Sequence, residues 1–311
     1  MKAAQINNYG GSDVIEINEI SKPIPKEGQI LVEVYASSVN PIDYKIRLGY
    51  LKGAIKSLPI TLGTDFAGVV EEVGSGVSEF KVGDEVYGNA IILGGGSGTL
   101  AEFTAANIGN TALKPKTLNF VASAALPLAA ASALQAIEEH IQIKEGQKIL
   151  IQGGAGGIGS LAIQLAKMHG AYVAATTSPE TLDFVKSLGA ELIIDYKTED
   201  FTKIIKDYDA VFDATAGEVA EKSLQVLKKG GIIVSMSGQF DQAEVEKYGV
   251  TTITQQTNTN AQKLRRIAGL VDTGKLKAEV DKVFSLDQVR QAFDYLEKEH
   301  PKGKVVVQIK S

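Results

Sequence analysis

The sequence contains no cysteine and no tryptophan, and only three of its 311 residues are histidines. Without cysteine, disulfide bonds, thiol catalysis and zinc sites with thiolate ligands are excluded. His140, His169 and His300 lie far apart along the chain, so we interpret each as a solvated surface residue. No metal site is therefore predicted.

Positive charge is also limited, with 32 lysine and arginine residues against 37 aspartate and glutamate residues. The net charge is -5 and the pI is about 5.4. Neutralisation of phosphates by basic residues is the main source of affinity for nucleic acids. The composition therefore predicts no nucleic-acid partner and favours a small molecule.

Long hydrophobic segments are almost absent. Residues 120–137 carry no charge, but alanine dominates them and Pro127 and several polar residues interrupt them. This pattern favours a buried helical region over a membrane span. Residues 1–13 lack the apolar core of a signal peptide, so we expect a cytoplasmic protein with no membrane partner.

The hydrophobic pattern changes along the chain. Up to about Lys116, short β-type runs alternate with glycine and proline, which is typical of an antiparallel barrel or sandwich. From Gly146, strand-length apolar runs alternate with helical segments, the last at residues 218–229. This alternation predicts a parallel sheet with helices on both faces, and the chain length favours two domains. After residue 255, the pattern predicts a helix, a strand, a helix and a last strand. These elements could extend the parallel sheet or return to the N-terminal β-rich region.

A glycine-rich loop follows the predicted strand at residues 148–152. Gly154, Gly156 and Gly159 match the G-x-G-x-x-G spacing, and a predicted helix begins near Gly157. In that context, glycines let the backbone approach a pyrophosphate at the positive end of the helix. The alternative is a turn that only permits close packing of strand and helix.

The end of the next predicted strand, residues 175–178, carries no carboxylate, and Glu180 already lies in the following helix. NAD-binding folds place an acidic residue there to bind the ribose 2′-hydroxyl. Thr177 and Ser178 can donate hydrogen bonds to a 2′-phosphate, and Lys197 can add charge. Because nothing at this strand end is expected to repel that phosphate, we favour NADPH over NADH. Ser178 also fits the role of a helix N-cap.

Several motifs occur in order: NPIDYKIRLG at 40–49, LGTDFAGVVEEVG at 62–74, a KVGDEVYG turn ending at 88, ALPLAAASALQAI at 125–137 and GGAGGIG. Together they resemble the zinc-independent quinone and enone oxidoreductases of the medium-chain dehydrogenase/reductase superfamily. The resemblance implies an α/β fold with a GroES-like β-barrel catalytic domain and a doubly wound Rossmann NADP-binding domain. The catalytic domain would comprise residues 1–120 and 256–311, and the nucleotide domain residues 121–255, with the active site in the cleft between them.

The chain departs from the zinc alcohol dehydrogenases of that superfamily at one motif. Those enzymes have a histidine in a G-H-E motif, whereas this chain has Gly63, Thr64 and Asp65. With no metal to polarise an alcohol, reduction of an electron-poor acceptor is the expected chemistry.

The resemblance also implies roles for residues near the N-terminus. Asn40 would contact the nicotinamide end of the cofactor, and an Asx-type turn before Pro41 is the less favoured alternative. Tyr44 is the first choice for a hydrogen bond to the substrate oxygen, and Lys45, with Arg47 and Tyr50, is a weaker candidate. A solvated position on a short helix is the alternative for each of these.

Two nearby carboxylates are expected to have structural roles. Asp43 is predicted to cap the start of the short helix. Asp65 is predicted to pair with a cation, for which Arg47 is the suggested partner.

Four further residues are cofactor contacts by resemblance or position. Ser132 would reach the nicotinamide ribose or a phosphate, and Tyr196 would line the adenosine pocket. Ser237 and Gly238 follow the fifth predicted strand, at the sheet edge where doubly wound folds bind ligands. Gly154, Ala155, Gly156, Gly157, Ile158 and Gly159 complete the predicted cofactor site.

The leading hypothesis is an NADPH-dependent reductase of quinones or α,β-unsaturated carbonyls. One alternative is a 2-enoyl-thioester reductase, and another is an NADPH-binding protein without turnover. Family resemblance alone suggests a homodimer.

Overall fold

The computed structural model describes residues 1–215 and 217–310, and it divides into two compact units. The first unit comprises Met1–Leu128, Thr259–Gly274 and the chain from Ala278 to the end of the described residues. The second comprises Ala129–Asn258 and Lys275–Lys277.

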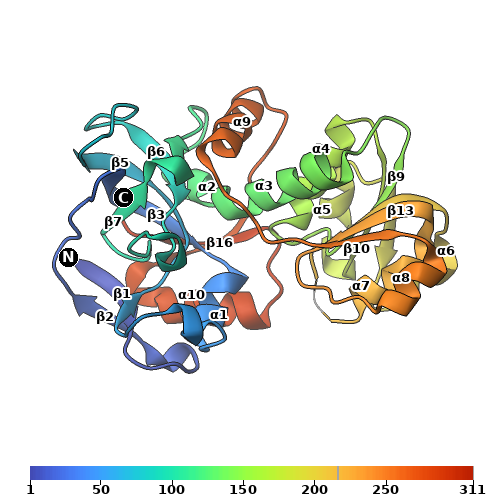
Figure 1. The fold of residues 1–311 in the computed structure, drawn as a ribbon, viewed down its shortest axis with the longest axis horizontal. Coiled ribbons are helices and arrows are strands. Elements are labelled where there is room, and N and C mark those ends of the chain that lie inside the picture. The colour runs from blue at the N-terminus through green and yellow to red at the C-terminus, as the bar shows by residue number, and fades with distance from the viewer. Residues whose placement is uncertain (216, 311) are drawn as a thin grey trace. The chain divides into compact units, whose positions relative to one another are not determined.

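The first unit is built on two sheets (Figure 1). A three-stranded sheet has the order β2–β1–β4, and a larger one has the order β15–β16–β3–β5–β6–β8 with β7 also paired to β3. The strands are β1 (Lys2–Ile6), β2 (Ile15–Glu19), β3 (Gln29–Val39), β4 (Ile60–Thr61), β5 (Asp65–Val73), β6 (Glu85–Asn89), β7 (Phe103–Asn107), β8 (Thr111–Leu113), β15 (Val280–Ser285) and β16 (Lys304–Gln308). Among the described strands of this unit, β15 and β16 alone pair in parallel, and a helix connects them.

The C-terminal part of the chain therefore completes the first unit. β16 pairs antiparallel with β3, and Val305 lies opposite Val39. The helices of this unit are α1 (Pro41–Arg47), α2 (Phe120–Ala124), α9 (Ala261–Asp272) and α10 (Val289–Lys298). The apolar face of α10, which includes Phe293, packs with Ile6 and Val305 in one buried core.

Helix α1 positions part of the predicted site. Pro41 occupies its first turn, where the missing N–H costs no hydrogen bond. The carboxylate of Asp43 accepts a hydrogen bond from the backbone N–H of Asn40 at 2.8 Å, which confirms its predicted capping role. Gly49, just beyond the helix, has φ of +83°, a conformation that favours glycine.

The second unit contains one parallel sheet of six strands in the order β11–β10–β9–β12–β13–β14. The strands are β9 (Lys148–Gln152), β10 (Tyr172–Thr177), β11 (Leu192–Asp195), β12 (Tyr208–Asp213), β13 (Leu227–Ser235) and β14 (Thr251–Thr254). Numbered within the unit, this is the 3-2-1-4-5-6 order of dinucleotide-binding folds. The strand order reverses between β9 and β12, which is where such folds bind ligands.

Helices cover both faces of this sheet: Figure 1 shows α4 and α5 on one side and α7 and α8 on the other. The helices are α4 (Gly159–Met168), α5 (Leu182–Ser187), α6 (Phe201–Ile204), α7 (Val219–Lys222) and α8 (Gln242–Tyr248). The helix expected over residues 218–229 is shorter than predicted: α7 ends at Lys222, and β13 begins at Leu227 because that residue pairs with Tyr208.

The uncharged segment at residues 120–137 forms helices, as predicted. It includes α2, α3 (Pro127–Leu134) and the start of a π-helix at Gln135–Ile141. Leu126, Ala130 and Ala133 are completely buried. Among the described residues, no helix has the length and apolar character needed to span a bilayer.

Candidate functional site

The glycine loop connects β9 to α4 in the second unit. The tight turn falls at Gly153, which has φ of +73°, one residue before the first glycine of the predicted motif. The N–H of Gly154 donates to the carbonyl oxygen of Thr176 at 2.9 Å, and the N–H of Gly153 donates to the Thr176 hydroxyl at 3.1 Å. These bonds tie the loop to the end of β10.

Gly156 and Gly159 are glycines for different physical reasons. A Cβ on Gly159 would lie 2.1 Å from the carbonyl oxygen of Gly153, so only glycine lets α4 approach the loop. A Cβ on Gly156 would meet no protein atom closer than 3.4 Å. The protein itself therefore leaves room at Gly156, beside a helix N-terminus whose first N–H groups lack intrahelical acceptors. This arrangement fits the pyrophosphate of a dinucleotide.

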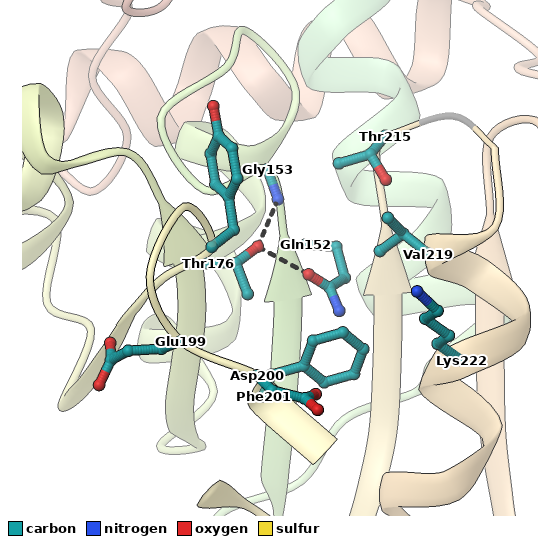
Figure 2. A pocket seen from close by; sticks show the side chains of 10 residues that line it. Gln152, Gly153, Thr176, Glu199, Asp200, Phe201, Thr215, Val219 and Lys222 are labelled. Atoms are coloured by element: carbon teal, nitrogen blue, oxygen red, sulfur yellow. Dashed lines mark hydrogen bonds between the residues drawn. The ribbon is translucent and has the colours of Figure 1, made fainter. Parts of the chain in front are cut away.

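A cavity of about 460 Å³ lies at the carboxyl ends of the central strands. Figure 2 shows Gln152, Thr176 and Thr215, which come from β9, β10 and the loop after β12. The Thr176 hydroxyl donates to Oε1 of Gln152 at 2.7 Å. The cavity is lined by Gln152, Gly153, Thr176, Tyr196, Glu199, Asp200, Phe201, Thr215, Val219 and Lys222.

Of these lining residues, the sequence predicted only Tyr196 as a cofactor contact. Gly153 belongs to the glycine-rich motif but was not predicted as a contact, and the others lie within or after strands β9 to β12, outside the quoted motifs. The sequence signal for them was their place at or near the carboxyl ends of predicted parallel strands, because those ends meet at one edge of a sheet.

Asp213, at the end of β12, organises the neighbouring strand end. This buried carboxylate accepts hydrogen bonds from the hydroxyl groups of Thr215, at 2.5 Å, and Ser235, at 2.6 Å. The Ser235 hydroxyl oxygen in turn accepts from the N–H of Gly238 at 2.7 Å. Ser237 donates its hydroxyl to the carbonyl oxygen of Thr215 at 2.9 Å. The structure thereby brings Ser237 to Thr215 at the cavity wall, and Gly238 to Ser235.

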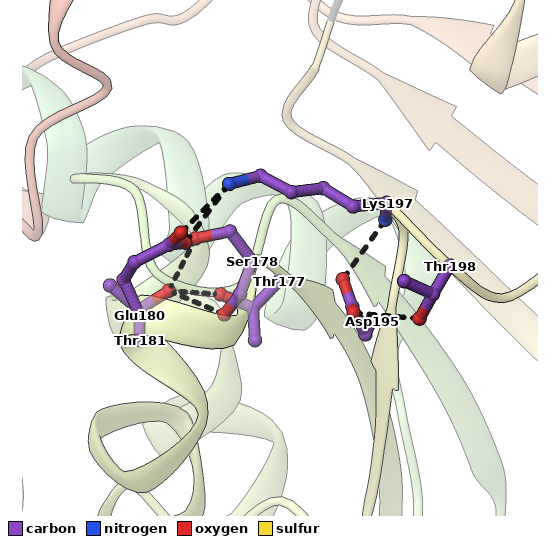
Figure 3. A network of polar contacts seen from close by, with 7 residues as sticks. All are labelled: Thr177, Ser178, Glu180, Thr181, Asp195, Lys197 and Thr198. Carbon is purple, nitrogen blue, oxygen red and sulfur yellow. Dashed lines mark hydrogen bonds and ion pairs between the residues drawn. The ribbon is translucent and has the colours of Figure 1, made fainter.

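The end of β10 differs from the prediction. Thr177 is buried, and its hydroxyl bonds to the hydroxyl of Thr181 at 2.6 Å. Lys197 lies in the same group of residues (Figure 3), and its ammonium group bonds to both carboxylate oxygens of Glu180, at 2.9 and 3.1 Å. The expectation that no carboxylate reaches this strand end was wrong, because the Glu180 side chain spans the distance to Lys197.

The first unit contains a buried polar cluster that includes Asn40. Lys304 donates a hydrogen bond to the side-chain oxygen of Asn40, and Asn40 Nδ2 donates to Asp65 at 2.9 Å. Asp65 also accepts from the hydroxyl of Ser38 at 3.0 Å and from the backbone N–H of Leu128 at 3.0 Å. All five residues lie in the first unit.

The second carboxylate of this cluster, Asp43, accepts from the hydroxyl of Thr64 at 2.6 Å. Burial raises the pKa of Asp43 to about 7 and the pKa of Asp65 to about 6. Burial also lowers the pKa of Lys304, because desolvation disfavours its charged form. Two carboxylates and one ammonium group thus share a dry site.

The suggested pairing of Asp65 with Arg47 was wrong. Arg47 bonds instead to Glu297 at 2.9 Å, and Lys304 is the cation that acts on Asp65. Lys304 begins the buried strand β16, and sequence reasoning missed it. A lysine at the start of an apolar run was the available signal, since lysine is rarely buried without a partner.

The hydrogen bonds that the Asn40 side chain already makes limit those that it can form with a ligand. Both amide hydrogens are used, by Asp65 and by the carbonyl oxygen of Ser38 at 3.3 Å. Its side-chain oxygen has two lone pairs, and Lys304 occupies one of them. Asn40 therefore has no amide hydrogen left to donate to a ligand.

Comparison with known proteins places the chain in a family. Residues 26–116 match the model for the alcohol dehydrogenase GroES-like domain, and residues 188–307 match that for zinc-binding dehydrogenases. An NADPH-dependent alkenal/one oxidoreductase of Arabidopsis thaliana is 42% identical over 99% of this chain and 79% of its own length. A 2-methylene-furan-3-one reductase of Solanum lycopersicum is 41% identical with the same coverage. The chain belongs to the medium-chain dehydrogenase/reductase superfamily.

The fold of this superfamily member is shared with solved structures. The quinone oxidoreductase from Coxiella burnetii has a TM-score of 0.92 at 35% identity, covering 100% of this chain and 99% of that one. The Escherichia coli quinone oxidoreductase complexed with NADPH has a TM-score of 0.90 at 25% identity, covering 99% and 100%. The predicted fold class, a GroES-like β-rich domain with a Rossmann domain, is confirmed.

Ser132 of this superfamily member is completely buried in α3. Its hydroxyl bonds to the hydroxyl of Thr257 at 2.6 Å, and its carbonyl oxygen accepts from Gln255 at 3.0 Å. The hydroxyl is therefore part of the internal packing of the second unit. Its contact with the nicotinamide half of a cofactor stays a prediction.

Tyr44 and Lys45 lie on α1, the helix that Asn40 precedes, and both side chains are half-buried. Tyr44 packs against the core that includes Ile6, and burial raises the pKa of its phenol, with Glu297 adding to the effect. The phenol therefore stays protonated at neutral pH and can act as a donor. Among the residues that the structure describes, no group of three or more histidine, aspartate or glutamate side chains is arranged to bind a metal.

Proposed function

We propose that this protein is an NADPH-dependent oxidoreductase that transfers hydride to a quinone or an α,β-unsaturated carbonyl compound. The observation that carries the proposal is the loop around Gly156, where the protein leaves room beside a helix N-terminus. The relatives named as alkenal/one oxidoreductase and quinone oxidoreductase support the acceptor class.

Residues 121–255 are proposed as the nucleotide domain. NADPH, when bound, supplies the hydride. The loop backbone, Gly154, Ala155, Gly156, Gly157, Ile158 and Gly159, would hold the pyrophosphate. Thr177, Ser178 and Tyr196 would contact the adenosine half, and Asn40, Ser132, Ser237 and Gly238 the nicotinamide half. Asn40 would do so as an acceptor, since both its amide hydrogens are already bonded.

Tyr44 is the proposed donor to the acceptor oxygen. Negative charge develops on that oxygen as the acceptor is reduced, and a donor held in place stabilises it. Because the acceptor is conjugated and already electron-poor, one phenol is sufficient. Lys45, the next residue on α1, is the second candidate for this role.

The test is consumption of NADPH and, separately, NADH with para-benzoquinone, methyl vinyl ketone and crotonyl-CoA, before and after treatment with a chelator. We expect NADPH consumption with the quinone or the ketone, unaffected by the chelator. Consumption only with crotonyl-CoA would indicate a thioester reductase, the class suggested by the 29% identical structure entitled CurK enoyl reductase. Binding of NADPH without consumption would overturn the proposed activity.

We also propose a cytoplasmic location and a homodimer. The relatives include proteins named as chloroplastic and mitochondrial, so location is tested directly by cell fractionation. Sedimentation equilibrium of the purified chain, at 33.0 kDa per subunit, tests the dimer.

A further inference from the structure

The group of residues around Lys197 carries an inference that rests on the proposed function and goes beyond it. Thr177 and Asp195 lie opposite each other at the ends of the parallel strands β10 and β11. The N–H of Tyr196 donates to the carbonyl oxygen of Thr177 at 3.2 Å, which holds the two strand ends together. In folds with this strand order, the end of the second strand faces the adenosine ribose.

The backbone of Lys197 is fixed by a tight turn. Its N–H donates to Oδ1 of Asp195 at 2.9 Å, and the other oxygen of Asp195 accepts from the hydroxyl of Thr198 at 2.7 Å. The N–H of Asp195 donates to Glu199 at 2.8 Å. Asp195 and Glu199 are thus engaged in the turn, and the side chain that faces the Lys197 ammonium is Glu180.

Glu180 engages Lys197 through both carboxylate oxygens (Figure 3). The Ser178 hydroxyl and the Lys197 ammonium lower the pKa of Glu180 to about 2, so it is ionised at neutral pH. The Glu180 side chain is 67% exposed, and the Lys197 side chain is 47% exposed. Such an exposed pair is easily separated, and its charges largely cancel as long as it is closed.

We propose that Glu180 is a specificity-determining residue that competes with the 2′-phosphate of NADPH for Lys197 and thereby reduces the preference for NADPH over NADH. The 2′-phosphate must displace Glu180 from Lys197 before it can pair with that ammonium group. The ribose of NADH presents a hydroxyl at that position, which can donate to Glu180 as it does to the acidic residue of NAD-binding folds. The pair therefore makes the chain tolerant of both nicotinamide dinucleotides.

The decisive variant is E180Q, which keeps the side-chain shape and removes the charge. Binding of NADPH and NADH is measured by isothermal titration calorimetry at low ionic strength, together with adenosine 2′,5′-bisphosphate and AMP as probes of the adenosine half alone. We expect E180Q to bind NADPH and the bisphosphate about fivefold to tenfold more tightly, with NADH and AMP unchanged or weaker. K197Q should weaken NADPH binding by about tenfold and leave NADH binding nearly unchanged.

E244Q is the matched control, because Glu244 forms a similar exposed pair with Lys247 on α8, a helix that follows β13. E244Q makes the same change in net charge as E180Q. It should leave the affinities for NADPH, NADH, the bisphosphate and AMP unchanged. In the K197Q background, the effect of E180Q should largely disappear, since Glu180 then has no ammonium to occupy.

The outcomes separate this inference from the proposed function. If the wild type binds NADPH but E180Q leaves the ratio of NADPH to NADH affinity within about twofold, the competition is overturned. An equal effect of E180Q in both backgrounds also overturns it, in favour of direct repulsion. If the wild type binds neither dinucleotide, the proposed function itself fails.

Discussion

The ammonium group of Lys304 donates a hydrogen bond to the side-chain oxygen of Asn40, a residue 264 positions earlier in the chain. The same ammonium donates to the carbonyl oxygen of Val39 at 3.1 Å, so it joins the start of β16 to the end of β3. Asp65 completes the contact from β5 through its bond to Asn40. One buried cation therefore sets the orientation of the Asn40 amide and balances a buried carboxylate.

Removing the charge of Lys304 should destabilise the protein strongly. K304M leaves Asp43 and Asp65 buried without a cation, and we expect the free energy of unfolding to fall by about 3–5 kcal/mol. The double variant K304M/D65N should lose less than the sum of the single variants, because it also removes a carboxylate. Urea denaturation measures these values, with K310M at an exposed ion pair as the control. Additive losses would contradict a direct interaction between Lys304 and Asp65.

Asp43 should make stability depend on pH in a defined direction. Its pKa is raised to about 7 in the folded protein, so between about pH 4 and pH 7 the folded state binds this proton more tightly than the unfolded chain. The stabilisation from protonated Asp43 is present below that window and is lost as the pH rises through about 7. Relative to D43N, the wild type should lose up to about 1.4 kcal/mol per pH unit across the window. Parallel stability curves for wild type and D43N would contradict this, and D13N at an exposed position serves as the control.

The features predicted correctly are those encoded by nearby residues. The glycine loop was predictable because its glycines, the preceding strand and the following helix are consecutive in the sequence. The alternation from Gly146 onward predicted the parallel sheet, since strand and helix periods differ locally. The motif even identified Gly159, although the tight turn itself falls at Gly153.

The features missed depend on contacts between distant residues. No spacing in the sequence relates Lys304 to Asn40 or Asp65, because the pairing of β16 with β3 brings them together. Glu180 was assigned to the helix that follows β10, and only the pairing of β10 with β11 places Lys197 within its reach. Strand order, which hydrophobic periodicity does not encode, decided both cases.

The two loop glycines should respond differently to alanine. G159A places a Cβ 2.1 Å from the carbonyl oxygen of Gly153, and we expect a loss of about 1–3 kcal/mol in unfolding free energy. G156A has room in the protein, so its stability should change by less than about 0.5 kcal/mol. Its NADPH dissociation constant should nevertheless rise at least about tenfold, because the methyl group occupies the space proposed for the pyrophosphate.

Calorimetry and urea denaturation distinguish these two effects. G109A is the control, since a Cβ at Gly109 meets nothing within 4 Å and the residue lies in the first unit. A G156A protein that binds NADPH as tightly as the wild type would show that the pyrophosphate lies elsewhere.

Tyr44 should affect turnover and leave cofactor binding intact. Y44F removes only the phenol hydroxyl, and its ring can keep its packing against the core around Ile6. We expect kcat/KM for the acceptor to fall at least about tenfold, because a donor to the developing oxyanion is lost. The dissociation constant of NADPH should stay within about twofold of the wild type, since the proposed adenosine and pyrophosphate contacts are unchanged.

Steady-state kinetics with para-benzoquinone and methyl vinyl ketone measure the effect, and Y172F, at a partly exposed tyrosine that begins β10, is the control. If Y44F reduces both acceptors at the wild-type rate, Lys45 becomes the donor to test, because it is the adjacent candidate on α1. A fall in kcat/KM confined to the ketone has a chemical reason, because a quinone spreads the added charge over two oxygens and depends less on one hydrogen bond. The ratio of the two falls in kcat/KM therefore measures how much the phenol stabilises the charge on the acceptor oxygen.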